Sequence, residues 1–229
     1  MSQKMKIIAA KEALKSVENN MKLGLGTGST VDEFLKLLSL EIKNGLSIIG
    51  VVTSEKTKDI SNNLGIPLTS LSKAGILDLT IDGADEVDPD LSLIKGGGGA
   101  LLREKIIAYN SKELIIIADK KKLVEKLGDF TLPIEVSPYE HKATSLKIMK
   151  KLGEIGYEGS IKLRLINQDV FITDGGNFIY DLSIGLIGEP YIIEQLLNSI
   201  PGVFENGLFI NLTNKVIIGN DSKAQVIER

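Results

Sequence analysis

Hydrophobic residues in the first half of the chain follow two alternating patterns. Stretches with apolar side chains at helical spacing predict helices over residues 5–18, 31–40, 54–64 and 100–110. Short apolar runs between them predict strands over residues 21–25, 46–53, 76–81, 91–94 and 114–118. Alternation of this kind is typical of a parallel sheet with helices on both faces, so an α/β fold is predicted here.

The pattern changes near Asp129. Strands are predicted over residues 132–136, 161–165, 170–174, 177–182, 207–211 and 216–219, with helices over residues 139–152 and 190–199. The pair Gly175-Gly176 favours a two-residue hairpin turn between two of these strands. Residues 130–210 as a whole fit a β-α-β-β-α-β unit, which predicts a second, smaller α/β domain.

Composition and charge narrow the class of protein. Of the 229 residues, 43% are hydrophobic and 25% are charged, which is typical of a globular protein with a sizeable core. The net charge of −3 predicts no nucleic-acid partner. The absence of cysteine excludes disulfides and thiolate catalysis and favours a cytoplasmic protein. No apolar run reaches the roughly 18 residues that a membrane helix needs, so no membrane partner is expected.

The turn between the first strand and the second helix reads Gly26-Thr27-Gly28-Ser29-Thr30. Glycines let the backbone approach an anion closely, and the following helix offers free N–H groups, so this turn suits a phosphate. It is not a P-loop, because no lysine follows the last glycine. The dinucleotide pattern also fails, because the third glycine is misplaced and no acidic residue ends the next strand. An ordinary glycine-rich turn is the alternative.

An acidic loop follows the strand predicted over residues 76–81. Its first residue, Asp82, is placed at the carboxyl end of a parallel strand, where ligands bind in open α/β sheets. Asp82 is therefore a candidate catalytic or sugar-binding carboxylate. A calcium loop does not fit, because Ala84 and Val87 stand where ligands would be needed. A solvated acidic turn stays open as the alternative.

A third segment runs from Lys95 through four consecutive glycines to a helix that carries Glu104. Four glycines cost much backbone entropy, so we expect a loop whose backbone lies against a ligand, with Lys95 at its rim. The helix is apolar nearly all round, which predicts that it is buried. A carboxylate on such a helix is costly unless it is paired or used, so Glu104 is either a catalytic or a salt-bridged structural residue.

Two further features carry weaker signals. The run Lys120-Lys121-Lys122 follows an apolar strand, and one of these lysines could reach a phosphate. A solvated basic turn is the ordinary interpretation of such a run. The only histidine, His141, lies early in a predicted helix and is interpreted as a structural or surface residue.

Taken together, these segments resemble the ribose-5-phosphate isomerase type A family. The resemblance rests on GTGST (26–30), TSEKT (53–57), TIDGADEVD (80–88), KGGGGALLREK (95–105), LPIEV (132–136) and PGVFENGLF (201–209). These motifs occur in the family's order and span almost the whole chain. A small departure is the turn at residues 173–177, where Asp-Asn-Gly-Asn would be expected.

The resemblance implies a fold, an assembly and an activity. The fold would be a Rossmann-like parallel-sheet domain, formed by residues 1–128 and 206–229, with a smaller ferredoxin-like α/β domain formed by residues 129–205. The chain would be a homo-oligomer, a dimer or a tetramer, without an organic cofactor or a metal. It would interconvert D-ribose 5-phosphate and D-ribulose 5-phosphate in the non-oxidative branch of the pentose phosphate pathway.

The resemblance also implies roles for named residues. The substrate would bind Thr27, Gly28, Ser29, Thr30, Asp82, Gly83, Ala84, Asp85, Lys95, Gly96, Gly97, Gly98 and one lysine of residues 120–122, for which Lys122 is chosen. Glu104 would be the base that moves a proton from C2 to C1 through an enediolate, and Asp82 would open the sugar ring. Lys95, Asp85 if protonated, and loop N–H groups would stabilise the enediolate oxygen. The division of labour among Asp82, Asp85 and Lys95 stays open.

Other functions fit the sequence less well. An amino-sugar-phosphate deaminase or a lactonase would share the glycine-rich phosphate loop, but no histidine-bearing catalytic motif is found. A sugar-phosphate sensor would need a DNA-binding helix pair, whereas the first 20 residues hold one predicted helix. A nicotinamide enzyme is disfavoured by the incomplete dinucleotide pattern.

Overall fold

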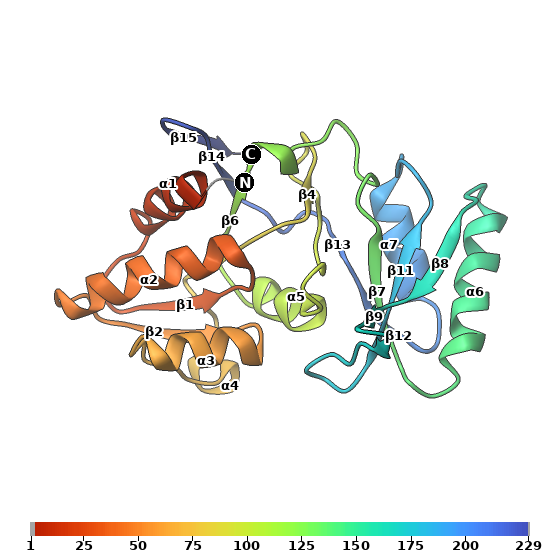
Figure 1. The fold of residues 1–229 in the computed structure, drawn as a ribbon, viewed down its shortest axis with the longest axis horizontal. Helices are drawn as coiled ribbons and strands as arrows, with labels where there is room; N and C mark the ends of the chain where they lie inside the picture. The colour runs from red at the N-terminus through yellow and green to blue at the C-terminus, as the bar shows by residue number, and fades with distance from the viewer. Residues whose placement is uncertain (1–2, 229) are drawn as a thin grey trace. The chain divides into compact units, whose positions relative to one another are not determined.

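The computed structural model describes residues 3–228, which divide into two compact units (Figure 1). The first unit comprises residues 3–84, 103–123 and 211–228, and the second comprises residues 85–102 and 124–210. The chain crosses from one unit to the other between Ala84 and Asp85 and again between Leu102 and Arg103. The first unit is therefore assembled from three separate segments of the sequence.

The first unit is built on a mainly parallel sheet. Its strands are β1 (Met21–Leu25), β2 (Ile48–Val52), β3 (Leu79–Asp82), β6 (Leu114–Asp119), β14 (Lys215–Gly219) and β15 (Ala224–Glu228), in the order β15-β14-β6-β3-β1-β2. Its helices are α1 (Gln3–Leu14), α2 (Ser29–Lys43), α3 (Glu55–Asn63), α4 (Leu71–Ala74), α5 (Leu101–Tyr109) and the 3₁₀ helix η1 (Lys120–Lys122). Only the β14–β15 pair of this sheet, as the structure describes it, is antiparallel.

Burial on both faces explains why this sheet is parallel. Every residue of β6 is buried, which matches its continuous apolar sequence. Phe34, Leu35 and Leu38 of α2 are fully buried in the same core as the side chains of β1, β3 and β6. Helix α1 buries the small residues Ala9, Ala10 and Ala13, which allow close packing against α2 and β6.

The second unit contains the predicted β-α-β-β-α-β arrangement. It runs through β7 (Leu132–Val136), α6 (His141–Glu154), β8 (Ser160–Leu163), β11 (Phe178–Ser183), α7 (Pro190–Asn198) and β12 (Val203–Asn206). The antiparallel sheet has the order β12-β7-β11-β8, which is that of a ferredoxin-like domain. Two smaller sheets accompany it, a hairpin of β9 (Leu165–Ile166) and β10 (Asp169–Val170), and β13 (Leu208–Phe209) with β5 (Leu93–Ile94) and β4 (Glu86–Val87).

The domain boundaries of the structure differ from those of the sequence. We expected residues 85–102, 124–128 and 206–210 in the parallel-sheet domain, but they belong to the second unit. The reason is the small sheet: β5 pairs with β4 and with β13, and β13 directly follows the last strand of the ferredoxin-like sheet. Glu86 reinforces this grouping, because its carboxylate accepts hydrogen bonds from the backbone N–H groups of Gly128 and Phe130.

The strand predicted over residues 170–174 is largely wrong. Asn167 and Gln168 both have positive φ angles, of 53° and 75°, and form a tight turn that pairs β10 with β9. The expected turn at 173–177 nevertheless forms, and Ile172 bridges to Phe178 across it. The buried carboxylate of Glu135 fixes this turn by accepting hydrogen bonds from Thr173 Oγ1 and Asn177 Nδ2, each at 2.9 Å.

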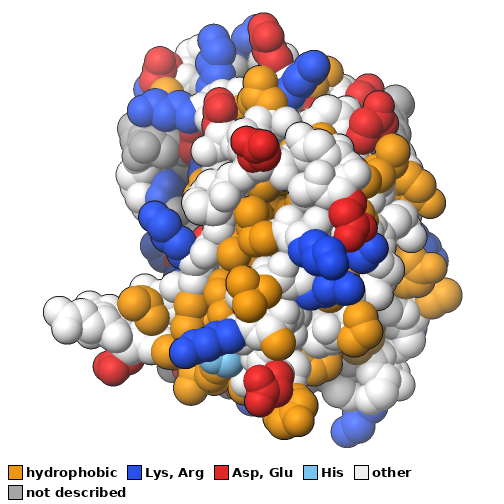
Figure 2. Space-filling model, turned by 90° about the vertical axis from the view of Figure 1, so that its right-hand side faces the viewer, with side chains coloured by type: hydrophobic (Ala, Val, Ile, Leu, Met, Phe, Trp, Pro, Cys, Tyr) orange, Lys and Arg blue, Asp and Glu red, His pale blue; other side chains and the backbone are white. Residues whose placement is uncertain are grey.

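The second unit carries exposed hydrophobic side chains. Figure 2 shows them interspersed with charged side chains on the face that carries α6. Leu165, Ile166 and Val170 of the β9–β10 hairpin are 54%, 53% and 39% exposed. Among the described residues, no helix is both long and apolar enough to span a membrane.

The ion pair between Asp78 and Lys112 in the first unit makes a pH-dependent contribution to the free energy of unfolding. Asp78 accepts hydrogen bonds from the Lys112 ammonium at 2.7 Å and the Lys22 backbone N–H at 2.9 Å. These donors, Lys112 first, hold the pKa of Asp78 below its ordinary value. Because the folded-state pKa lies below the unfolded-state value, this stabilisation exists at neutral pH and is lost as the pH falls through the folded-state pKa.

We expect Asp78→Asn to lower the free energy of unfolding by about 1 kcal/mol at pH 7. The difference from wild type should narrow as the pH falls below about 4, where the carboxyl group of the unfolded chain becomes protonated. Urea unfolding at pH 7 and at pH 3 measures it. Both proteins share all other titratable groups, so a difference that is equal at the two pH values would contradict this assignment.

Candidate active site

Polar segments gather at the carboxyl ends of the strands of the parallel sheet. Residues 26–30, 53–57 and 120–122 follow β1, β2 and β6, and residues 82–84 comprise the last residue of β3 and the two after it. From β1 the chain first adds β2 on one side and later adds β3 on the other, so the order reverses between β1 and β3. Such a reversal opens a crevice at the carboxyl ends of the strands, where ligands bind in α/β sheets.

Asp82 joins the two strands at this point of reversal. The side chain is 1% exposed, and its Oδ1 accepts hydrogen bonds from the backbone N–H groups of Thr27 at 3.0 Å and Gly83 at 2.7 Å. Gly26 N also donates to Ile81 O at 2.9 Å. A Cβ atom on residue 26 would lie 2.1 Å from Asp82 Oδ1, so only glycine fits there. The carboxylate is thus fixed against the first glycine of the loop.

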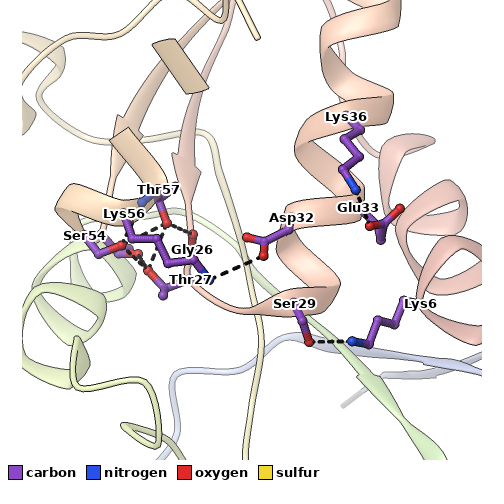
Figure 3. A network of polar contacts seen from close by, with 11 residues as sticks. Lys6, Gly26, Thr27, Ser29, Asp32, Glu33, Lys36, Ser54, Lys56 and Thr57 are labelled. Carbon is purple, nitrogen blue, oxygen red and sulfur yellow. Dashed lines mark hydrogen bonds and ion pairs between the residues drawn. The ribbon is translucent and has the colours of Figure 1, made fainter. Parts of the chain in front are cut away.

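A cluster of hydroxyl groups holds the next residue of the loop (Figure 3). Thr27 Oγ1 lies 2.8 Å from Thr53 Oγ1, 2.7 Å from Ser54 Oγ and 3.1 Å from Thr57 Oγ1. Thr57 Oγ1 donates to Gly26 O at 2.9 Å, while Ser54 caps α3 by accepting from Thr57 N. Sequence reasoning gave this cluster no role, although its members except Thr27 lie within the TSEKT motif.

The loop ends on the first turn of α2. Gly28 is the N-cap of this 15-residue helix, followed by Ser29, which is exposed, and Thr30, which is buried. The Lys6 ammonium from α1 donates to Ser29 Oγ at 2.7 Å (Figure 3). A helix N-terminus, a hydroxyl and an ammonium side by side are suited to a phosphate. Lys6 was missed, because nothing in its own sequence context indicates that α1 brings it to this loop.

Glu104 lies in the first turn of α5 and is 4% exposed. After α5, Ser111 Oγ lies 2.6 Å from Thr80 Oγ1, and Leu77 N donates to Asn110 O, so the helix ends beside the beginning of β3. The helix therefore runs back along the sheet from the carboxyl edge, and its first turn lies toward the edge that carries Asp82. Asp82 and the helix turn that carries Glu104 thus lie at the same end of the strands.

The helix that carries Glu104 is less buried than predicted. Ile106 is 46% exposed and Tyr109 is 79% exposed, so the expectation of burial nearly all round is wrong. Ile107 is buried and belongs to a hydrophobic cluster that includes Val51 and Leu77. Arg103, on the exposed side, donates to Glu55 of α3 at 3.0 Å.

Of the three lysines in η1, one is less exposed than the others. Asp119 Oδ1 accepts a hydrogen bond from Lys121 N at 2.8 Å and so caps this turn. Lys122 is partly buried, whereas Lys120 and Lys121 are exposed. The difference favours Lys122 as the residue with a specific role, and leaves the other two as the solvated part of the run.

The remaining candidates belong to the second unit. Asp85 Oδ2 accepts a hydrogen bond from Gly97 N at 2.7 Å, and Asp85 N donates to Ile94 O. Lys95 is 2% exposed, and its ammonium lies 5.4 Å from the centre of the Phe209 ring. The acidic loop therefore divides: Asp82 belongs to one unit and Asp85 to the other.

The later acids of the loop hold backbone turns. Glu86 accepts from Gly128 N and Phe130 N, and Asp88 Oδ1 accepts from Asp90 N at 3.0 Å and Ser92 N at 2.8 Å. His141, interpreted from sequence as structural, lies with Nδ1 2.8 Å from the Tyr180 hydroxyl. It also contacts the Phe178 ring edge-on, which agrees with a packing role.

Comparisons with known proteins identify the family. The family model for ribose 5-phosphate isomerase A (phosphoriboisomerase A) matches residues 49–223. The ribose-5-phosphate isomerase A of Rhizobium meliloti (strain 1021) is 50% identical over 226 residues, covering 99% of this chain and 98% of that protein. The chain belongs to the ribose 5-phosphate isomerase A family.

Other members agree along the whole length. The ribose-5-phosphate isomerase A of Brucella suis biovar 1 (strain 1330) is 50% identical, covering 100% of this chain and 98% of that protein. A structure of D-ribose-5-phosphate isomerase in complex with phospho-erythronic acid superimposes with a TM-score of 0.93 at 44% identity and 100% coverage of both chains. The ribose 5-phosphate isomerase of Plasmodium falciparum gives 0.93 at 37% identity and 98% coverage of both.

Membership of the isomerase A family confirms the resemblance seen in the sequence motifs. The candidate residues of this family member fall into one group in each unit. Thr27–Thr30, Asp82–Ala84, Glu104 and Lys122 lie in the first unit, and Asp85 and Lys95–Gly98 lie in the second. Asp85 follows Asp82 by three residues, and Glu104 follows Gly98 by six. The candidate residues of the two units are therefore close to one another in the sequence.

Proposed function

We propose that this chain interconverts D-ribose 5-phosphate and D-ribulose 5-phosphate as an enzyme of the pentose phosphate pathway. Identity of 50% with isomerases A over nearly the full length carries the proposal. The reaction moves one proton and two electrons between adjacent carbons, so no net oxidant is consumed. It needs a base, a way to open the sugar ring and donors for a negative oxygen, and no organic cofactor or metal is proposed.

The phosphate is proposed to bind at the first turn of α2. The N-terminus of a long helix favours an anion, and Ser29 and Thr30 add hydroxyl groups there. Lys6 is already directed at Ser29, and Lys122 is the further cation that we assign to the phosphate. The phosphate is remote from the bonds that change, so its binding energy serves to hold the open-chain sugar in place.

Glu104 is proposed as the base that takes the proton from C2 and returns it to C1. Its place on a helix fixes the carboxylate, and its burial excludes most water from it. Because the two carbons are adjacent, one base on one face of the enediolate can serve both steps. Arg103, the neighbouring cation, is directed to Glu55 of α3.

Asp82 is proposed to open the sugar ring, and groups of the second unit are proposed to stabilise the enediolate. Lys95 provides a nearly buried ammonium, and Asp85 fixes the backbone of residue 97. An ammonium or an N–H group aimed at a developing negative oxygen is the kind of donor that lowers such a barrier most. We assign residues 96–98 to the substrate site, and the Gly98 N–H group to the role of a donor, because Gly97 N–H donates to Asp85.

We also propose that the chain acts in the cytoplasm as a homo-oligomer, either a dimer or a tetramer. The lack of cysteine fits a reducing compartment. A sugar phosphate is the partner that the site supports, and neither nucleic acid nor a membrane is proposed.

Turnover of ribose 5-phosphate in the presence of EDTA tests the function, and phospho-erythronate tests the site. This acid is named as bound in a structure that is 44% identical, and its carboxylate resembles the enediolate. Competitive inhibition is therefore expected. Ser29→Ala and Lys6→Ala should raise both KM and the inhibition constant about tenfold, with little change in kcat, because each removes a hydrogen bond to a charged group.

Lys36→Ala is the matched control, since Lys36 lies on α2 but pairs with Glu33 at 2.6 Å. Wild-type protein without turnover would refute the function. Unchanged KM in both variants would refute the phosphate site alone.

A further inference from the structure

The guanidinium of Arg164 is held in a fixed orientation within the second unit. Arg164 follows β8, and its side chain is 12% exposed. Nε donates to Asp181 Oδ2 at 2.9 Å, and Nη2 donates to Asp181 Oδ1. Two parallel bonds of this kind fix both the position and the plane of a guanidinium. Asp181 lies in β11, in the middle of the ferredoxin-like sheet, so the support is rigid.

The third nitrogen of this guanidinium contacts the glycine loop. Arg164 Nη1 donates to Gly96 O at 2.8 Å and to Gly97 O at 3.3 Å. Gly96 O also accepts from Gly99 N at 3.0 Å, which closes a tight turn. Nε and Nη2 of the guanidinium therefore bind Asp181, while Nη1 binds two successive carbonyl groups of the loop.

Phe171 holds the end of the same loop. Its backbone N–H donates to Arg164 O at 2.9 Å, so both residues form the base of the β9–β10 hairpin. The Arg164 guanidinium carbon lies 5.9 Å from the centre of the Phe171 ring. Gly99 has a φ angle of +81°, and a Cβ atom there would lie 2.3 Å from Phe171 Cζ. The hairpin base thus contacts the loop at Gly96, Gly97 and Gly99.

These contacts determine where the loop N–H groups point. The N–H and C=O of one trans peptide point in opposite directions, and the described residues contain no cis peptide. Since Arg164 takes the carbonyl groups of Gly96 and Gly97, the N–H groups of Gly97 and Gly98 point away from it. Gly97 N donates to Asp85, which is half-buried, whereas Gly97 and Gly98 are exposed. Gly98 N–H is therefore presented on the side of the loop opposite to Arg164.

We infer that Arg164, oriented by Asp181, is a positioning residue for the isomerisation: it orients the peptide between Gly97 and Gly98 so that the Gly98 N–H group faces a negative oxygen of the sugar. This inference rests on the proposed function of the glycine loop. The N–H groups of the Arg164 guanidinium donate to Asp181 and to the carbonyl groups of Gly96 and Gly97. Its effect is transmitted through the peptide planes, and it falls on the step in which the enediolate oxygen gains charge.

Arg164→Lys and Arg164→Ala in the full chain test this inference. Lysine keeps the charge but lacks the planar fork, so it cannot hold Asp181 and both carbonyl groups together. We expect kcat to fall about 10²-fold in both variants, as for other small misplacements of catalytic groups, with KM changed less than about threefold. The affinity for phospho-erythronate should fall with kcat, whereas the affinity for inorganic phosphate should stay at the wild-type value.

Two readouts separate positioning from mere loss of structure. Guanidinium ion at millimolar concentration should restore part of the kcat of Arg164→Ala, whereas ethylammonium should not. Asp181→Asn, which keeps the arginine but removes its charged support, should lower kcat in the same direction. Lys151→Ala, which breaks an exposed ion pair with Glu154 on α6, is the matched control and should retain wild-type kcat.

The outcomes are distinguishable. Wild-type protein without turnover would refute the proposed function itself. Wild-type turnover with unchanged kcat in Arg164→Ala or Arg164→Lys would overturn the positioning role alone. Parallel loss of kcat, phosphate affinity and thermal stability, without guanidinium rescue, would also overturn it. If Arg164→Ala does not fold, Arg164→Lys and Asp181→Asn decide by the same criterion, a fall in kcat with little change in KM.

Discussion

Glu104→Gln is expected to lower kcat for ribose 5-phosphate by about 10²–10⁴-fold, the usual contribution of a positioned base. Glutamine has nearly the same shape as glutamate but cannot accept the C2 proton. Glu104 is buried in the first turn of α5, where a neutral amide of equal size should be accommodated. KM and the thermal unfolding temperature should therefore remain close to those of the wild type.

Conversion to ribulose 5-phosphate and exchange of the C1 proton of ribulose 5-phosphate with solvent deuterium are the two measurements. Both should collapse together, because both require the same base. Glu55→Gln is the matched control: Glu55 is an exposed carboxylate on α3 that pairs with Arg103, next to Glu104 in the sequence. Near wild-type turnover in Glu104→Gln, or an equal loss in Glu55→Gln, would refute the assignment of the base.

Asp82→Asn is expected to lower conversion of ribose 5-phosphate by about 10²-fold, the lower range for loss of an acid–base group. The proton exchange of ribulose 5-phosphate should be affected much less. Ribulose 5-phosphate cannot close a furanose ring, because its C5 oxygen carries the phosphate, so exchange at C1 needs no ring opening. Asparagine Oδ1 can still accept the hydrogen bonds from Thr27 N and Gly83 N, which keeps the loops in place.

Proton NMR in deuterium oxide gives both rates from one sample of the variant. A rate of conversion that falls far more than the rate of exchange would assign ring opening to Asp82. An equal fall in both rates would contradict that role and would move Asp82 to the proton-transfer step. Glu104→Gln, in which exchange is expected to disappear, serves in the same assay as the reference for a variant that has lost proton transfer.

Elements with strong local patterns could be predicted from the sequence. The strands at residues 21–25 and 132–136 match to the residue, and β6 differs by one residue, since their apolar runs are bounded by polar residues. The β-α-β-β-α-β order was also predicted correctly. The β9–β10 hairpin was not, because its turn uses Asn167 and Gln168 rather than glycine. Strand β15, at the edge of its sheet, has a mixed pattern and was also missed.

Residues of the candidate site could be proposed from the sequence only where they lie in one segment. Asp82 could be proposed because it stands at the carboxyl end of a predicted strand, and the loop at residues 26–30 because its glycines stand between a predicted strand and a predicted helix. The contact of Lys6 with Ser29 and the contact of Arg164 with the glycine loop join residues 23 and 68 positions apart. Such contacts depend on how whole elements pack, and the spacing of residues within one segment contains no information about them.

The discontinuity of the first unit has a consequence for synthesis on the ribosome. Strand β14 pairs with β6, and Asn214 accepts a hydrogen bond from Leu114 N, 100 residues earlier. All of residues 124–210 must therefore emerge before the parallel sheet can be completed, and the second unit has its whole sequence available first. Until then one edge of β6, an apolar strand, lacks its native neighbour and is open to pairing with other chains. The nascent isomerase is thus vulnerable to aggregation until the residues of β14 have left the exit tunnel, and contacts this distant in sequence make completion of the sheet slow.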